Sequence, residues 1–94
     1  MIISFRSKAL ERFWMKGDSR QIDPRHVAKL TVLLSSLDAA AMPIAMNLPG
    51  FGFHGLSGDQ SGGYSVKVNK NWRITFGWSQ TGVDAVDVDY EDYH

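Results

Sequence analysis

Five residues of this sequence could together handle protons and a phosphate. His54 stands in a glycine-rich stretch, while Asp92, Tyr93 and His94 directly follow the last β-strand pattern. Two imidazoles can serve as general base and general acid near neutral pH, and a carboxylate can orient or charge-stabilise one of them. Arg73, at the start of an earlier strand pattern, could hold a phosphate and neutralise charge that grows in the transition state. This set suits RNA cleavage by the neighbouring 2′-hydroxyl, which requires no metal and no cofactor.

Each of these residues also has an ordinary structural explanation. A single histidine in a glycine loop, such as His54, is usually a solvated surface residue. His26 is expected to be exposed near the start of a polar-flanked helix. Arg73 could form a cross-strand ion pair with an acid on the last strand, and Tyr93 could serve packing. Residue types alone therefore leave the role of the set open.

Length and composition predict one small domain over residues 1–94. The hydrophobic content of 44% is enough to form a core. The absence of cysteine excludes a disulfide framework, a thiolate zinc site and a cysteine nucleophile. Neither a signal peptide nor an apolar run of membrane-spanning length is recognisable, so a cytoplasmic protein with no membrane partner is expected.

The net charge is zero, but the charges are sorted along the chain. Residues 1–30 carry seven Lys and Arg against three Asp and Glu, whereas residues 74–94 carry five acids and no Lys or Arg. Between them lie Lys67, Lys70 and Arg73. Neutrality argues against strong non-specific binding to free nucleic acid, but it allows a basic patch on one face.

The first half of the chain predicts a strand and two helices. The apolar, β-branched stretch 2–5 predicts a strand. Ser7 can cap a helix over 8–17, in which apolar residues recur at i, i+3 and i+4. Asp23 and the proline after it can start a second helix that ends near residue 40. A short polar segment joins the two, so a helical hairpin with one buried side is expected.

Residues 49–63 hold six of the nine glycines and predict a loop. Gly50, Gly52 and Gly55 spell G-x-G-x-x-G, but a dinucleotide-binding motif should follow a strand and open a helix. Here the motif follows a helix and precedes strands, so we interpret the match as chance.

Period-2 alternation over 64–68, 72–78 and 86–90 predicts three strands joined by hairpins. A three-residue loop places Val68 opposite Trp72. The prediction is an α+β domain of order β-α-α-β-β-β, with a two-helix hairpin on one face of a mainly antiparallel, four-stranded sheet. The valine and aromatic rows, Val86 included, should face the helices. The polar face should carry Lys67, Arg73, Thr75, Asp87, Asp89 and Glu91.

Four stretches together resemble a known family: MIISF at the start, FHGLSGD at 53–59, NWRITF at 71–76 and YEDYH at the end. They resemble the HigB-type plasmid-maintenance killer toxins of the RelE/ParE superfamily, over nearly the whole chain. The fold implied by this resemblance is the RelE-like one, a helical hairpin on a sheet.

The resemblance implies the toxin half of a toxin–antitoxin pair, an endoribonuclease that enters the ribosomal A site, cuts mRNA and halts translation. Its partners would be the ribosome, mRNA and a HigA-like helix-turn-helix antitoxin. The toxin would bind DNA only indirectly, through this antitoxin. The implied catalytic residues are His54, Asp92, Tyr93 and His94, with the roles of base and acid unassigned. Arg73 matches the arginine that contacts RNA near the cut, and Lys67 and Lys70 are candidates for further RNA contacts.

Two departures keep an alternative open. Related toxins often carry a basic residue where this chain has Ser57, and they are often basic overall. Relatives on the ParE side inhibit DNA gyrase without such a set of imidazoles. The alternative is therefore a non-enzymatic, gyrase-inhibiting toxin or a catalytically weakened toxin that acts by binding.

Overall fold

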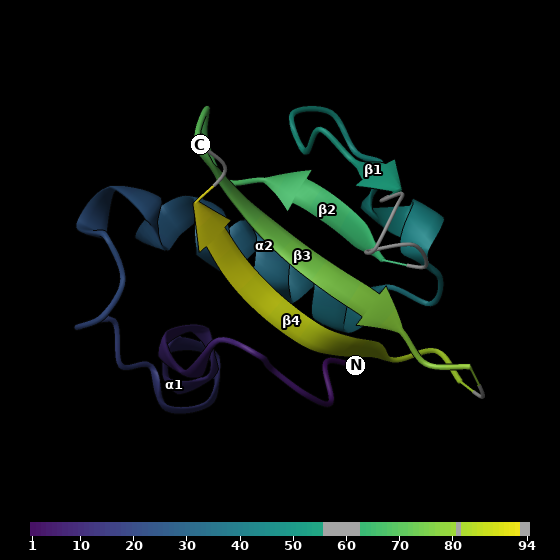
Figure 1. Cartoon of the computed structure of the whole chain (residues 1–94), viewed down its shortest axis with the longest axis horizontal. Helices are drawn as coiled ribbons and strands as arrows, with labels where there is room; N and C mark the ends of the chain where they lie inside the picture. The colour runs from purple at the N-terminus through teal and green to yellow at the C-terminus, as the bar shows by residue number, and fades with distance from the viewer. Residues whose placement is uncertain (56–62, 81, 93–94) are drawn as a thin grey trace.

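An antiparallel sheet with one helix behind it forms the centre of the molecule (Figure 1). The computed structural model describes residues 1–55, 63–80 and 82–92. The helical elements are α1 (Lys8–Lys16), the 3-10 turn η1 (Pro24–His26), α2 (Val27–Ala39) and the 3-10 turn η2 (Pro43–Met46). The strands are β1 (His54–Gly55), β2 (Tyr64–Lys67), β3 (Trp72–Trp78) and β4 (Ala85–Asp92), hydrogen-bonded in the order β1-β2-β3-β4. The predicted α+β class with a four-stranded antiparallel sheet is confirmed, but the predicted order β-α-α-β-β-β is not, because β1 rather than the stretch 2–5 is the fourth strand.

Helix α1 has the predicted caps at both ends. The Ser7 hydroxyl accepts a hydrogen bond from the backbone N–H of Leu10 at 3.1 Å, and Gly17 ends the helix with φ +67°. Glycine adopts this left-handed conformation without a Cβ penalty. Leu10 is fully buried. In Figure 1, α1 is seen end-on below β4.

Helix α2 begins as predicted and supplies much of the core. The Asp23 carboxylate accepts from the backbone N–H of Arg25 at 2.9 Å, and Pro24 opens a 3-10 turn that leads into the helix. Figure 1 places α2 behind the sheet. Its four fully buried leucines are Leu30, Leu33, Leu34 and Leu37. The hydrophobic effect of burying these side chains against the sheet fixes the helix in place.

The N-terminal segment joins the free edge of β4 without forming a continuous strand. Ile2 and Phe5 form isolated parallel bridges with Ala85 and Val88. The predicted strand over 2–5 is therefore an interrupted edge partner. The interruption lies beside a β-bulge in β4. At this bulge the pairing of β4 with β3 shifts register between the β3 residues Thr75 and Gly77.

The bulge also corrects the predicted alternation of the last strand. Asp87 lies at the bulge with φ +53°, and the extra residue shifts everything before it to the opposite face. Val86 therefore pairs with Gly77 instead of joining the apolar row, and Ala85 takes the fully buried position opposite Trp78.

The hairpin between β2 and β3 has the predicted register, and the loop before β2 is shorter than predicted. The N–H of Val68 donates to the carbonyl of Trp72 at 2.9 Å, so these two residues face each other across the turn. Within the predicted loop over 49–63, His54 and Gly55 form β1 against β2. No helix in the described ranges is long and apolar enough to cross a membrane.

Candidate functional site

The sheet face that α2 leaves uncovered gathers three of the seven predicted site residues. Val66 and Ile74 are fully buried on the helix side, and side chains alternate along a strand. Cross-strand partners share a face, so the registers place one polar set on the opposite side. We call this set the outer face: His54, Ser65, Lys67, Arg73, Thr75, Asp89 and Glu91.

Lys67 and Arg73 are direct cross-strand partners on the outer face. Two neighbouring cations can together bind a phosphate group. Glu91 is the partner of Arg73 on the other side, and its carboxylate accepts from the Thr75 hydroxyl at 2.6 Å. The outer face thus carries a basic half toward β2 and an acidic half along β4.

His54 lies on the basic half of the outer face. It pairs with Ser65 on β2, two residues from Lys67 on the same face, and its side chain is exposed. Diagonal neighbours of this kind have side chains roughly 7–8 Å apart, within reach of one phosphate group. Of the predicted set, the structure therefore brings together His54, Lys67 and Arg73.

Contacts with α2 and β2 fix the loop that leads to His54. Gly50 has φ +83°, its carbonyl accepts from Lys29 of α2 at 3.2 Å, and the Lys29 ammonium lies 5.2 Å from the centre of the Phe51 ring. The buried Phe51 accepts at its carbonyl from the N–H of Lys67 at 2.6 Å. Gly52 follows with φ +57°. Two glycines of the apparent G-x-G-x-x-G motif thus serve loop geometry ahead of a strand.

Asp92 lies on the far edge strand from His54, and as the partner of Trp72 it belongs to the helix-side row with Ile74 and Tyr90, not to the outer face. It ends β4 opposite Trp72, and its side chain is exposed. Three inter-strand steps separate β1 from β4, which is about 14 Å. The structure therefore does not bring Asp92 into contact with His54. Tyr93 and His94 lie outside the described residues, as does Ser57.

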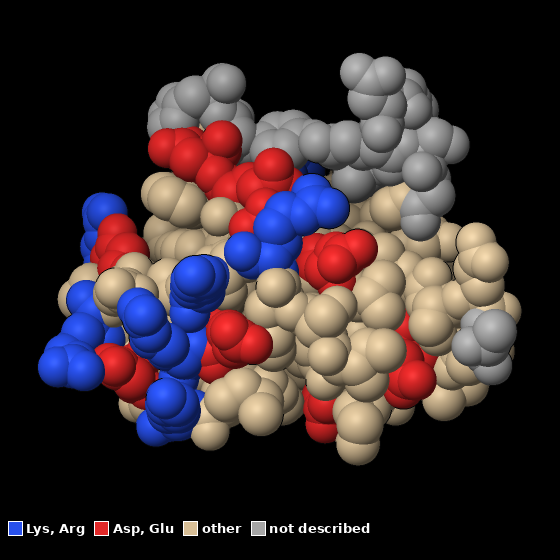
Figure 2. All heavy atoms as spheres, turned by 60° about the horizontal axis from the view of Figure 1, so that its bottom comes forward, with Lys and Arg blue, Asp and Glu red and all other residues tan. Residues whose placement is uncertain are grey.

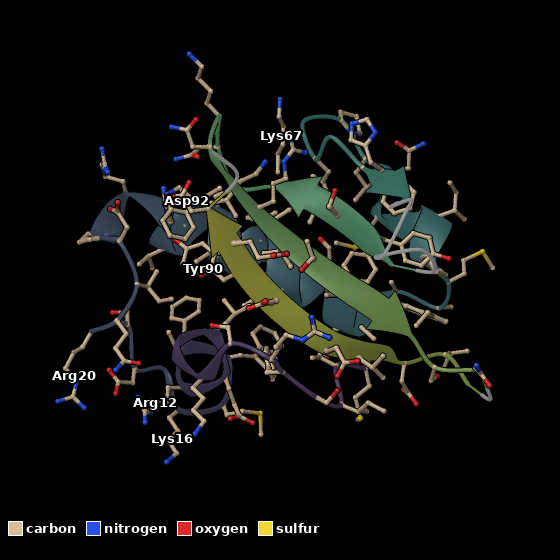
Figure 3. All side chains as sticks on the ribbon, in the orientation of Figure 1. Arg12, Lys16, Arg20, Lys67, Tyr90 and Asp92 are labelled. Carbon is tan, nitrogen blue, oxygen red and sulfur yellow. The ribbon has the colours of Figure 1, made fainter. Side chains whose placement is uncertain are left out.

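Four other cations lie away from His54. Lys70 is exposed in the turn between β2 and β3. Arg12, Lys16 and Arg20 lie together at the α1 end of the molecule, away from Lys67 and Asp92 (Figure 3). Figure 2 shows Lys and Arg gathered at this end. The basic first helix therefore does not line the outer face. Within the described residues no group of His, Asp and Glu could hold a metal ion.

His26, expected to be exposed, is buried with 2% of its surface accessible. Its Nδ1 forms a short hydrogen bond with the Tyr90 hydroxyl, and its Nε2 lies 2.7 Å from the amide nitrogen of Asn69. The ring also contacts that of Trp72, with centroids 5.8 Å apart. The expectation failed because the partners are 43 and 64 residues away in sequence. No local pattern around His26 signals them.

Tyr90 is partly buried beside this histidine, two residues before Asp92. Its ring lies 4.6 Å from that of Trp72, centre to centre. Burial, and then the charge of Asp23, raise the pKa of the Tyr90 hydroxyl to about 12. The phenol therefore stays protonated across the physiological range.

Comparison with known proteins gives a consistent result. The family described as the RelE-like toxin of type II toxin-antitoxin system HigB matches residues 3–94. Endoribonuclease HigB of Proteus vulgaris is 35% identical over 94 residues, which cover all of both chains. Toxin HigB-1 of Vibrio cholerae is 33% identical over 97 residues, which cover all of this chain and 98% of that one. The YoeB-YefM complex from Staphylococcus aureus has the same fold, with a TM-score of 0.59 and 19% identity over 100% of this chain and 98% of that chain.

Proposed function

This chain belongs to the HigB family of RelE-like toxins of type II toxin–antitoxin systems, and on that premise we propose that it is an endoribonuclease that cuts mRNA. The observation that carries the proposal is the outer face. An exposed imidazole, His54, shares this face with the Lys67–Arg73 pair. A general acid or base beside two phosphate-binding cations is what cleavage of a phosphodiester requires.

The reaction would use the 2′-hydroxyl of the RNA as its nucleophile. One imidazole removes the hydroxyl proton as the oxygen attacks phosphorus, and the bond to the 5′-oxygen breaks. The other imidazole gives a proton to the leaving oxygen, and a 2′,3′-cyclic phosphate remains. His54 and His94 fill these two roles, in an order that the experiments below can assign.

The other predicted residues would act on charge and orientation. Arg73 and Lys67 would neutralise the crowded phosphate, with Lys70 contacting the RNA further along the turn. Asp92 and Tyr93 would orient or charge-stabilise an imidazole near the cut. Because Asp92 ends a strand that lies about 14 Å across the sheet from β1, and the register places it on the row opposite to the outer face, the proposal requires the RNA and the end of β4 to complete the site together.

The setting of the reaction is also proposed. Membership of a toxin–antitoxin family implies an antitoxin partner. We assign this partner to a HigA-like helix-turn-helix protein, and the substrate to mRNA in the ribosomal A site, in the cytoplasm. The neutral net charge supports the ribosome requirement, because weak binding to free RNA makes a preassembled RNA surface necessary.

The decisive experiment compares wild type, His54→Ala and His94→Ala on programmed ribosomes, with mRNA 5′ ends mapped by primer extension. Ser35→Ala, an exposed change on α2, is the matched control. We expect cleavage by wild type and control on ribosomes only, and a loss of at least a hundredfold in each histidine variant. Cleavage of free RNA at the same rate would refute the ribosome requirement, and full activity of either histidine variant would remove that residue from the site.

The gyrase alternative is tested on the same protein. If wild type leaves mRNA intact on ribosomes, the supercoiling activity of DNA gyrase is measured with and without the toxin. Inhibition of gyrase by both wild type and His54→Ala would establish a binding toxin that does not use the imidazoles.

A further inference from the structure

We propose that His26 is a positioning residue for the end of β4, where it holds Tyr90 and thereby sets the place of Asp92. The inference rests on the proposed function in one respect, namely that the end of β4 carries part of the catalytic set. His26 itself is buried on the helix side of the sheet and does not face the substrate.

Four groups from four different elements meet at His26. His26 ends η1, Asn69 lies in the turn between β2 and β3, Trp72 begins β3, and Tyr90 lies near the end of β4. The rings of His26 and Tyr90 meet edge to face, with centroids 6.0 Å apart. We call these four residues the His26 cluster. It ties the start of α2 to the end of the sheet that lies nearest Asp92.

The orientation of the Asn69 amide determines which nitrogen of His26 carries a proton. The Asn69 carbonyl oxygen accepts from the backbone N–H groups of Asn71 and Trp72, both at 2.9 Å. The amide NH2 group is therefore the part that points at His26 Nε2. An NH2 group only donates, so Nε2 must accept and Nδ1 must carry the proton. The Nδ1–H then donates to the Tyr90 oxygen.

These hydrogen bonds connect His26 to the last cross-strand residue pairs of β3 and β4. Trp72, whose N–H is held by Asn69, is the cross-strand partner of Asp92, and Tyr90 is the partner of Ile74 on the adjacent rung of that face. Strand ends fray unless side chains hold them. The His26 cluster supplies that hold from the helix side.

Packing alone would not require a histidine at this place. A leucine could fill a similar volume, but it would leave the Tyr90 hydroxyl and the Asn69 amide free to move or to find water. Directional hydrogen bonds in a buried setting fix a ring's position more narrowly than apolar contact does. A buried polar group that is fully satisfied therefore suits a residue whose role is to fix geometry.

The test uses the full-length protein and four variants. His26→Leu removes both hydrogen bonds, Tyr90→Phe removes only the hydroxyl, and His26→Gln keeps one donor and one acceptor. Leu37→Ala is the control, because it lowers stability from the same helix, eleven residues and about 16 Å along the axis from His26. Thermal melting is measured for each variant, to check that it folds and that the control is at least as destabilised as His26→Leu.

Two readouts separate positioning from general stability. In single-turnover cleavage on programmed ribosomes, His26→Leu and Tyr90→Phe should lower the maximal rate tenfold or more with unchanged half-saturation, and His26→Gln should recover part of it. Hydrogen exchange by NMR should accelerate at the amides of Trp72 and Asp92 in His26→Leu but not in Leu37→Ala. The imidazole 15N signals of wild type should report the proton on Nδ1.

Each result decides the inference. Rates and exchange in His26→Leu that match those of Leu37→Ala would overturn it, as would a proton found on Nε2 in wild type. If wild type itself does not cleave mRNA, the proposed function fails, and the exchange and 15N measurements alone still decide whether His26 fixes the end of β4.

Discussion

The side chain of Lys67 lies directly against Gly52. A Cβ built at position 52 would come within 2.9 Å of the Lys67 Cδ and 3.1 Å of its Cγ. The N–H of Lys67 also donates to the carbonyl of Phe51. The lysine assigned to the RNA therefore packs against the loop that leads to His54.

Gly52→Ala should destabilise the protein and lower cleavage more than a comparable change elsewhere. The new Cβ meets the Lys67 stem, and the left-handed φ of +57° adds about 1–2 kcal/mol for any residue with a Cβ. We expect a loss of roughly 2 kcal/mol in the free energy of unfolding, measured by urea titration followed by tryptophan fluorescence. Cleavage on programmed ribosomes should fall as well, because His54 shifts with the loop.

Gly17→Ala provides the control for that experiment. Gly17 has φ +67°, but nothing lies within 4 Å of a Cβ built there. It should therefore show the conformational cost alone, about 1 kcal/mol, with unchanged cleavage. Equal losses of stability and activity in both variants would show that the contact between Lys67 and Gly52 has no importance of its own.

Local signals in the sequence were sufficient for the caps and the hairpin. Ser7, Gly17 and Asp23 act within a few residues of their own positions, so their roles follow from residue type and spacing. The turn that sets Val68 opposite Trp72 is equally local. The bulge at Asp87 was not predictable from such signals, because its N–H is held by the Ser4 hydroxyl, 83 residues away.

The residues of the candidate site also divide into those that could be predicted from the sequence and those that only the folded chain brings together. Strand alternation was sufficient to place Lys67 and Arg73 on one face, whereas His54 was predicted in a loop and was assigned to the site from the family resemblance. The two-residue strand that carries His54 is too short to give a period. His26 was missed because its burial depends on Asn69 and Tyr90, which only the folded chain brings near.

Asp87→Val should destabilise the bulge, and Asp87→Gly should not. A β-branched residue at φ +53° is strained by about 1–2 kcal/mol, whereas aspartate tolerates this conformation and glycine adopts it freely. We expect Asp87→Gly to stay within about 0.5 kcal/mol of wild type, since relief of strain is offset by a more flexible unfolded chain. Urea unfolding measures both. Equal stability of the valine and glycine variants would mean that the bulge relaxes without cost.

Lys67→Ala should weaken RNA binding in a salt-dependent manner. If the Lys67 ammonium neutralises one phosphate of the single-stranded RNA, the slope of log K against log salt concentration should become shallower by about 0.7. The measurement is fluorescence anisotropy with a single-stranded RNA oligonucleotide at several salt concentrations. Lys8→Ala, an exposed change of the same charge at the start of α1, is the control and should leave the slope unchanged. The same change of slope in both variants would mean that only net charge matters.

Tyr90 should make the protein lose stability at alkaline pH. Burial raises the pKa of its hydroxyl to about 12, against about 10 in the unfolded chain. Below pH 10 both states are protonated, so the contribution of Tyr90 to stability is fully present. Above pH 10 the unfolded state ionises first, and stability should fall as pH rises toward 12.

The absorbance of tyrosinate follows this ionisation directly, because the chain contains only three tyrosines. One of them should titrate near pH 12 while the fold persists, and the Tyr90→Phe variant should lack that step. The same variant should also lose less stability between pH 10 and 12 than wild type does. If all tyrosines of the folded protein titrate near pH 10, burial does not raise the pKa of Tyr90, and this prediction is wrong.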